Sequence, residues 1–282
     1  MDSVSFLKDM YGKFGCSAPN LHCVLGSGLS DALEKAKLSD QWSEIGEIAF
    51  KEIPNFSSAT VEGHPGKYRI FKNKKGFVVS LQLGRLHGYE GLEPAKVAQS
   101  VTQICAAGTK KFLLTNAAGG LNKNYHPGSL MIIDDHINFT GRNPLVGPNP
   151  KDSKGKALGP RFPDLSAVYD KKTSALLEKV LQKSFDVHHG TYVGVLGPSF
   201  ETPAEVKLFS SWGMGAVGMS TVWEAIALKH RGAEVTGLSF ISNYGCGLVD
   251  SSALDHNDVL NQGKQSAEKL INSLFSFFEE LI

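Results

Sequence analysis

The sequence lacks the features of a membrane or secreted protein. Its 282 residues contain no apolar run that approaches the ~18 residues of a membrane-spanning helix. The amino-terminal stretch carries Asp2 and has no uninterrupted apolar run of the ~7–15 residues that a signal peptide requires. We therefore expect a cytoplasmic protein that does not associate with a membrane.

Cysteine and net charge are also scarce. The four cysteines show no CxxC spacing and stand in mostly apolar sequence, which favours reduced thiols over disulfides. Lysine and arginine number 29 against 28 aspartates and glutamates, so the net charge is +1. No broad positive field is therefore available to hold a nucleic acid backbone, and a small anion would need a local site.

Complete nucleotide-binding signatures are missing at the glycine-rich turn Gly26-Ser27-Gly28. A dinucleotide fingerprint would need glycine where Asp31 stands, and no Gly-Lys-Ser/Thr follows, as a P-loop requires. These gaps argue against a dinucleotide-dependent oxidoreductase. The glycines still let backbone N–H groups approach an anion, and Ser27 adds a hydroxyl donor. The turn is therefore either a phosphate site or a plain tight turn.

What the sequence does contain is an alternation of strand and helix patterns. Short apolar runs predict buried strands at residues 21–25, 68–71, 77–83, 112–114, 130–133, 192–196, 216–219 and 235–241. Apolar residues at steps of three and four predict helices at residues 94–107, 165–182, 203–211, 221–230 and 256–282. The alternation predicts a single α/β domain over residues 1–282, with a central β-sheet flanked by helices.

Two further patterns refine this prediction. Thr202 with Glu205, and Thr221 with Glu224, have the spacing of capping boxes and support two of the helix starts. Residues 141–163 hold five prolines with several glycines and polar residues. A long loop of this kind is usually functional or part of an interface.

The densest polar cluster follows the predicted strand at residues 77–83. Arg85 can direct two N–H groups onto a phosphate, His87 can add a third donor, and Tyr89 can donate to a sugar hydroxyl. The alternative is a surface ion pair between Arg85 and Glu90. Because α/β sheets bind ligands at the carboxyl ends of their strands, we favour a binding role.

Other candidates stand at the ends of predicted strands. Glu201 can accept two N–H bonds from a planar heterocycle, while Phe200 covers the ring or the sugar. Asn243 offers both a donor and an acceptor to the edge of a base. Ser220 opens a helix, and the small residues of Thr115-Asn116-Ala117-Ala118-Gly119-Gly120 could bring backbone amides to a ligand. Taken alone, Glu201 is also consistent with a carboxylate that stabilises a helix N-terminus, and Asn243 and residues 115–120 are also consistent with turns.

Two clusters of acids and histidines have the composition of metal ligands. They are Asp134-Asp135-His136 and His188-His189. Neighbours in sequence rarely face one point, so we predict structural roles for both clusters and no metal site. His64 lies in a turn between glycines and is as consistent with a solvated residue as with a ligand contact.

A resemblance to the trimeric purine nucleoside phosphorylases rests on motifs that occur in this order between residues 26 and 244: GSGL, GHPG, GRLHGYEG, TNAAGG, GPSFETPAE, VGMSTVWEA and SNYG. The resemblance implies an α/β fold with a mixed sheet and a homotrimer. It also implies no metal or other cofactor, with inorganic phosphate as the co-substrate that cleaves a purine nucleoside. Trp223 departs from the family, which usually has proline at this position.

The resemblance further implies a role for each matching residue. The phosphate site is expected at Ser27, His64, Arg85, His87, the Ala117 backbone and Ser220. The nucleoside site is expected at Tyr89, Phe200, Glu201, Met219, Asn243 and His256, with Phe162 lent by a neighbouring subunit. The expected catalytic residues are His87, Glu201 and Asn243.

Base preference follows from two of these positions. In the family, asparagine at the position of Asn243 accompanies 6-oxopurines, whereas the related methylthioadenosine phosphorylases carry aspartate there and an apolar partner in place of the 5′-hydroxyl contact. Asn243 and His256 therefore predict inosine and guanosine as substrates in preference to adenosine. The alternatives are a xanthosine or 5′-methylthioadenosine phosphorylase and, more distantly, a noncatalytic nucleoside-binding protein.

Overall fold

The computed structural model describes residues 1–36, 38–57, 65–152, 154–249 and 256–282, with the backbone alone for residues 256–265. Across these residues nine strands form one sheet. Their spatial order is β2 (Trp42–Ala49), β3 (Lys67–Asn73), β4 (Val78–Leu83), β1 (Leu21–Leu25), β5 (Lys111–Gly120), β8 (Ala216–Gly218), β7 (Val187–Gly194), β6 (Leu130–Asn138) and β9 (Glu234–Tyr244).

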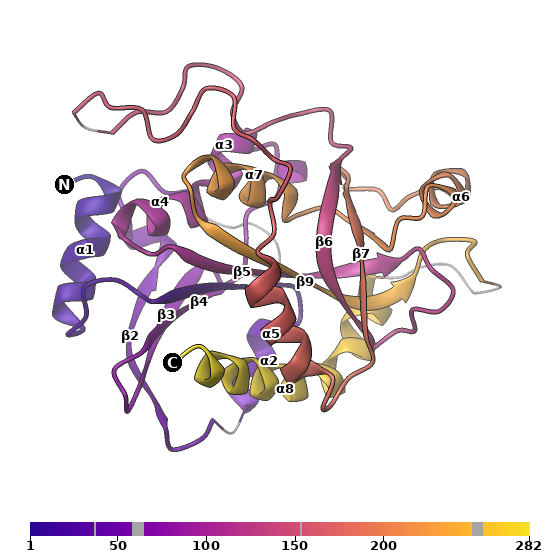
Figure 1. Ribbon diagram of the computed structural model, residues 1–282, viewed down its shortest axis with the longest axis horizontal. Coiled ribbons are helices and arrows are strands. Elements are labelled where there is room, and N and C mark those ends of the chain that lie inside the picture. Colours follow the sequence, from indigo (N-terminus) through magenta and orange to yellow (C-terminus); the bar gives the residue numbers. More distant parts are fainter. Residues whose placement is uncertain (37, 58–64, 153, 250–255) are drawn as a thin grey trace.

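The sheet is mixed and closes on itself at one side. β1 runs parallel to β4 and β5, and β5 runs parallel to β9, so the carboxyl ends of these four strands reach the same edge. β5 pairs with both β8 and β9, which joins β5, β8, β7, β6 and β9 into a ring. Figure 1 shows β6 and β7 crossing the layer of β5 and β9 steeply. The predicted α/β fold with a mixed sheet is confirmed.

Helices cover both faces of this sheet (Figure 1). One layer holds α1 (Ser3–Lys13), α3 (Pro94–Val97), α4 (Gln99–Ala107) and α7 (Val222–His230). The other holds α2 (Leu29–Lys35), α5 (Lys171–Leu181) and α8 (His256–Glu280), while α6 (Pro203–Ser211) lies beyond β7. None of the helices in the described segments is both long enough and apolar enough to cross a membrane.

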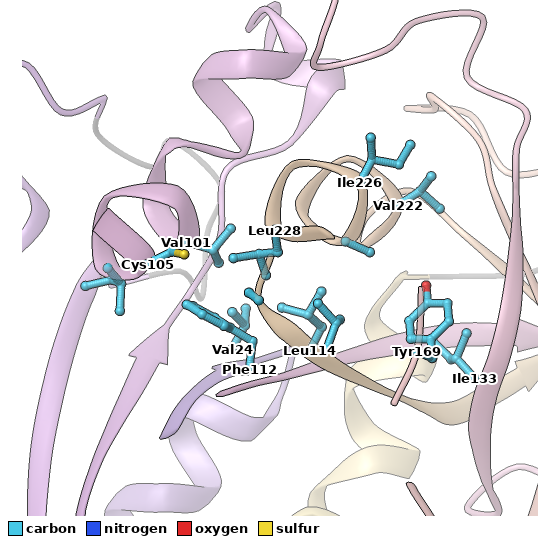
Figure 2. Packing of buried hydrophobic residues seen from close by; sticks show 14 of the residues in the cluster. Val24, Val101, Cys105, Phe112, Leu114, Ile133, Tyr169, Val222, Ile226 and Leu228 are labelled. Carbon is cyan, nitrogen blue, oxygen red and sulfur yellow. The ribbon is translucent and has the colours of Figure 1, made fainter. Parts of the chain in front are cut away.

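Alternate residues of the central strands pack against the helix layers on the two opposite faces of the sheet. Phe112 and Leu114 of β5 pack with Leu228 of α7 in one buried cluster, which Figure 2 shows. Leu113, which lies between them in sequence, belongs to the opposite cluster with Phe278 of α8. Successive strand residues face opposite sides, so a sheet with two buried faces requires uninterrupted apolar runs such as that of β5.

The structure extends one predicted strand and adds another. β5 continues to Gly120, so Thr115 to Gly120 lie within the strand, and the alternative interpretation of this stretch as a turn is wrong. β2 has no counterpart among the predicted strands. It pairs with β3 alone, most of its residues are at least partly exposed, and its register shifts between Glu44 and Gly46. An edge strand with such a bulge lacks the apolar run that predicts a buried strand.

Only one of the two predicted capping boxes forms. The Thr202 hydroxyl accepts the Glu205 N–H at 3.2 Å, and the Glu205 carboxylate accepts the Thr202 N–H at 2.7 Å. Thr221, by contrast, has a φ of 70° and makes no capping bond with its side chain. The Glu224 carboxylate binds a buried arginine instead. A positive φ is strained for a β-branched residue, which marks the start of α7 as a candidate functional segment.

Two other helices differ from the prediction in their bounds. The helix predicted from residue 165 begins at Lys171, where the Asp170 carboxylate accepts the Thr173 N–H at 2.7 Å. The helix predicted for residues 94–107 divides at Ala98 into α3 and α4. The described part of residues 141–163 is the predicted long loop, with one isolated bridge between Lys151 and Ala157.

Candidate active site

A cavity of about 320 Å³ opens at the carboxyl edge of the sheet. It is lined by residues that follow β1, β4 and β7, by the end of β8 with the two residues after it, and by the last residues of β5 and β9. Its size is typical of a small-molecule site, and α/β sheets bind ligands at this edge. β5 carries a register shift between Ala118 and Gly119, at the cavity wall, where a bulge re-aims the strand.

Most of the residues predicted for the site converge on this cavity. Ten of them line it: Ser27, Arg85, His87, Tyr89, Ala117, Phe200, Glu201, Met219, Ser220 and Asn243. His64 lies outside the described residues, and so does the side chain of His256, whose backbone begins α8. Phe162 is 87% exposed on the long loop and does not line the cavity of its own chain.

The turn after β1 brings Ser27 to the cavity wall. A Cβ added at Gly26 would lie 2.8 Å from the Asn116 Cα, so glycine is required for this close approach of two backbones. The Gly26 N–H donates to the Thr115 hydroxyl at 3.0 Å, and that hydroxyl donates to the Val24 carbonyl at 2.8 Å. Thr115 therefore fastens the turn to the neighbouring strand.

Arg85 is a buried cation that is held from behind the cavity. Its Nε and Nη2 donate to the two carboxylate oxygens of Glu224 at 3.3 and 2.8 Å. Its Nη1 donates to the Thr115 carbonyl at 2.8 Å. The guanidinium is 2% exposed and its carboxylate partner 1%, so the surface ion pair considered as an alternative for Arg85 is wrong.

His87 and Tyr89 form a stacked pair at the cavity wall. Their ring centroids lie 4.6 Å apart with an interplanar angle of 16°. The Glu90 carboxylate accepts the His87 N–H at 2.7 Å and lies 3.4 Å from His87 Nδ1. Burial, with the Glu90 charge adding to it, raises the pKa of the Tyr89 phenol to about 12. Tyr89 therefore keeps its proton at neutral pH and is a hydroxyl donor.

A chain of hydrogen bonds sets the direction of the Ser220 hydroxyl. Asn116 Nδ2 donates to Thr221 Oγ1 at 2.9 Å, and that oxygen lies 3.2 Å from Ser220 Oγ. Arg85 Nη1 also donates to Ser220 Oγ, at 3.4 Å. The Thr221 hydroxyl is buried and already accepts from Asn116, so donation to Ser220 satisfies it. Ser220 Oγ then accepts from both Thr221 and Arg85, which leaves its own proton for another acceptor in the cavity.

The amide of Asn243 is oriented by its neighbours. The Ser242 hydroxyl donates to Asn243 Oδ1 at 2.8 Å, and Asn243 Nδ2 donates to the Tyr244 carbonyl at 2.8 Å. One Nδ2 proton and one Oδ1 lone pair remain for a ligand. Burial, with the neighbouring Glu205 charge adding to it, raises the pKa of the Glu201 carboxyl above its usual value.

The cavity wall thus carries two chemically different sets of polar groups. We call Ser27, Arg85, His87 and Ser220 the anion donors, and Glu201 with Asn243 the base-edge pair. The anion donors offer N–H and O–H groups, as an anion requires. The base-edge pair offers a carboxylate beside an amide, which matches the mixed donors and acceptors of a nitrogen heterocycle. Phe200 and Met219 add apolar surface to the same cavity.

The acid and histidine clusters lie outside this cavity, and their side chains contact other residues of the protein. His189 Nδ1 lies 2.8 Å from Asp134, and its Nε2 lies 3.3 Å from Glu178. His188 Nε2 lies 2.8 Å from Asp186. Within the part of the chain that the structure describes, no group of three or more histidines, cysteines and acids could hold a metal ion.

Comparison with known proteins identifies the family. Residues 23–278, which include the ten cavity residues named above, match the family model of the phosphorylase superfamily. The chain is 40% identical over 266 residues to purine nucleoside phosphorylase 1 of Bacillus subtilis strain 168, and the alignment covers 93% of each protein. The chain belongs to the purine nucleoside phosphorylase family. The family resemblance inferred from the motifs is therefore confirmed.

Solved structures of this family have the same fold. The structure of Schistosoma mansoni purine nucleoside phosphorylase in complex with adenosine matches with a TM-score of 0.82 and 31% identity, over 99% of this chain and 97% of that chain. The structure of that protein with inosine matches with a TM-score of 0.81 and 31% identity, over 99% and 95% of the two chains. The cavity therefore lies within the shared fold.

Three buried residues next to the anion donors are not among the predicted site residues: Asn116, Thr221 and Glu224. The sequence pattern places Thr221 and Glu224 in a capping box, and Asn116 in a stretch whose backbone amides could reach a ligand. A partial signal exists for Glu224, because a buried arginine at the end of a strand requires a carboxylate partner. The sequence does not say which carboxylate supplies it, because that depends on how α7 packs against the sheet.

Proposed function

We propose that the protein catalyses the reversible phosphorolysis of 6-oxopurine ribonucleosides and deoxyribonucleosides, inosine and guanosine above all. The products are the free purine and ribose or deoxyribose 1-phosphate. The observation that carries the proposal is that one cavity holds both the anion donors and the base-edge pair in a chain of this family. Inorganic phosphate is the co-substrate, and no metal or organic cofactor takes part.

The reaction requires two opposite charges to be stabilised together. The C1′–N9 bond breaks with its electron pair leaving on the purine, while the ribose takes on oxocarbenium character. A phosphate dianion held by the anion donors stabilises the cation and then forms the new O–C1′ bond, so positioning supplies much of the rate. Asn243 stabilises the departing purine at N7 and O6, and Glu201 holds N1–H. The dianion is already a nucleophile and needs no general base.

The ribose is expected to lie between phosphate and base. Tyr89 hydrogen-bonds a sugar hydroxyl, as the protonated phenol described above allows. Met219 and Phe200 contact the sugar with their apolar surfaces, and His256 faces the 5′-hydroxyl. The family resemblance supports these roles, and the presence of Tyr89, Met219 and Phe200 on the cavity wall supports three of them.

The proposal includes a homotrimer in which Phe162 completes the nucleoside site of a neighbouring subunit. Phe162 is 87% exposed on a long loop, and Phe139 and Trp212 are 49% and 48% exposed elsewhere on the surface. The ring centroids of Phe139 and Trp212 lie 6.2 Å apart, and a contiguous exposed apolar patch supports intermolecular contact. A cytoplasmic location stays a prediction from the sequence.

Variants of the exposed loop test whether Phe162 completes the nucleoside site of a neighbouring subunit. Phe162→Ala is expected to raise the KM for inosine about tenfold or more, because an aromatic wall of the site is lost, while Val146→Ala on the same exposed loop leaves it unchanged. Sedimentation equilibrium should give three times the 30.4 kDa chain mass for both variants.

Mixed trimers distinguish a residue lent by the neighbour from one used in its own chain. Co-assembled Phe162→Ala and Glu201→Ala subunits should regain activity, since some sites then combine an intact Glu201 with the intact Phe162 of the adjacent subunit. If the mixture is no more active than the average of its parents, or if the protein is a monomer, the proposed exchange is wrong.

Inosine binding in the absence of phosphate is expected to weaken as the pH falls through the raised pKa of Glu201. The ionised carboxylate is the stronger acceptor for N1–H, so protonation should lower the affinity about tenfold. Because the pKa is raised above 4.5, the loss begins at a higher pH than for an ordinary glutamate. Calorimetric titration of the wild type and of Glu201→Gln checks this. The variant should show a flat profile, and an equally flat wild-type profile would contradict the role of Glu201.

The proposed reaction and its specificity are tested together by base release from a panel of nucleosides. We expect inosine and guanosine to be cleaved only when phosphate is present, and adenosine to be a poor substrate. Faster turnover of xanthosine or 5′-methylthioadenosine would instead support the alternative base preferences. A folded protein that cleaves none of these nucleosides would be a binding protein and not an enzyme.

A further inference from the structure

Arg85 and Glu224 form an ion pair directly behind the cavity wall. Arg85 lines the cavity, whereas Glu224 is not among the lining residues. Two N–H groups of the guanidinium meet the two carboxylate oxygens at 3.3 and 2.8 Å, and a third donates to the Thr115 carbonyl at 2.8 Å. Both side chains are almost fully buried, at 2% and 1% exposure. The guanidinium plane is therefore fixed on two sides by groups that do not themselves face the ligand.

Stability alone is a weak explanation for this pair. Desolvating two charges costs about as much as their attraction returns, so well-packed apolar residues of similar volume often give a fold that is equally stable. The pair does supply a fixed orientation, because a two-pronged bond between a guanidinium and a carboxylate restricts rotation of the arginine. Its benefit is therefore expected at the cavity, in the placement of the Arg85 N–H groups.

We infer that Glu224 is a positioning residue for the phosphate co-substrate, acting through Arg85; this inference rests on the function proposed above. Glu224 holds the guanidinium so that Nη1, which already donates to Ser220 Oγ at 3.4 Å, stays beside the other anion donors. It also offsets the positive charge of Arg85. Phosphate is then bound by directed hydrogen bonds and not by excess charge, which leaves the dianion free to attack C1′.

The start of α7 is built to set several anion donors at once. Ser220 immediately precedes it, Thr221 has a φ of 70°, and Glu224 lies in its first turn. Trp223 contacts the turn of His87, since a Cβ added at Gly88 would lie 2.5 Å from the indole. The same short segment therefore supplies one anion donor directly, orients a second through Glu224 and packs beside a third.

The test is steady-state kinetics of Glu224→Gln with phosphate and inosine varied separately. The amide is isosteric, but its NH₂ group opposes one guanidinium N–H and its charge is gone. We expect the KM for phosphate to rise about 10- to 100-fold, because misplacing a positioned group costs this much, while the KM for inosine stays near the wild-type value. Calorimetric phosphate binding to the same variant should weaken by the same factor.

Two further variants separate positioning from a general loss of structure. His230→Gln alters a buried residue at the far end of the same helix, where His230 bonds Asn149 at 3.0 Å, and should leave the KM for phosphate unchanged. Glu224→Asp keeps the charge and shortens the reach, and should give an intermediate KM if Glu224→Gln does not fold. A folded Glu224 variant with a wild-type phosphate KM and phosphate affinity overturns the inference. Absence of phosphate-dependent cleavage by the wild type would instead overturn the proposed function.

Discussion

Glu201→Ala is expected to lower kcat/KM for inosine about a thousandfold, because truncating a charged hydrogen-bond partner that the bound base covers costs roughly 2–5 kcal/mol and each 1.4 kcal/mol is tenfold. The variant leaves the N1–H of the base without an acceptor at the cavity wall. The kcat/KM for guanosine should fall about tenfold further than that for inosine, since the 2-amino group of guanosine can donate to the second carboxylate oxygen. The KM for phosphate should stay nearly unchanged, because the anion donors come from other segments of the chain.

Initial rates with inosine, guanosine and phosphate varied in turn check this prediction. Glu205→Gln is the matched control, because it removes a neighbouring charge while glutamine still satisfies the capping box of α6. A Glu201→Ala variant that cleaves inosine at near the wild-type rate would show that the carboxylate does not contact the base. An equal loss for both nucleosides would show that it accepts a single N–H.

Asn243→Asp is expected to reverse the preference between inosine and adenosine. Replacing the Nδ2 donor by an acceptor oxygen turns an attraction to O6 into a repulsion, which should lower inosine cleavage by about 100-fold or more. The 6-amino group of adenosine can donate to the same oxygen. The ratio of adenosine to inosine kcat/KM should therefore rise about 100-fold.

Asn243→Ala serves as the control for this exchange. It removes the donor without adding an acceptor, so inosine cleavage should fall and adenosine should gain no advantage. Competition between the two nucleosides in one reaction, with the bases separated by chromatography, gives the ratio directly. An unchanged ratio in Asn243→Asp would mean that Asn243 does not contact position six of the purine.

The fold was predictable where burial on both sides of the sheet leaves a strong pattern. β1 is bounded as predicted because each of its five residues is buried. β2 was missed because it is a half-exposed edge strand, and α1 and α2 were not predicted either. The strands β5, β8, β7, β6 and β9 form a ring through pairings between segments that are distant in the sequence. Apolar runs do not indicate which strands pair.

The site was predictable to the extent that its residues follow strands in recognisable motifs. Arg85, His87 and Asn243 stand at strand ends, where the topology brings them to one edge. The supporting residues were not predictable in this way. Glu224 matches a local capping pattern, but its carboxylate binds the buried guanidinium of Arg85 instead of the helix start. Thr221 adopts a backbone conformation that its residue type disfavours, so local preference predicted the opposite.

The central claim is that the two sets of polar groups in the cavity bring phosphate and a purine nucleoside together for reaction. Phosphorus NMR of the wild-type protein with inosine and phosphate, combined with chromatography of the base, tests it most directly. We predict one ribose 1-phosphate formed and one phosphate consumed for each hypoxanthine released. Hypoxanthine released with free ribose and no consumption of phosphate would contradict the account, because water and not phosphate would then be the nucleophile.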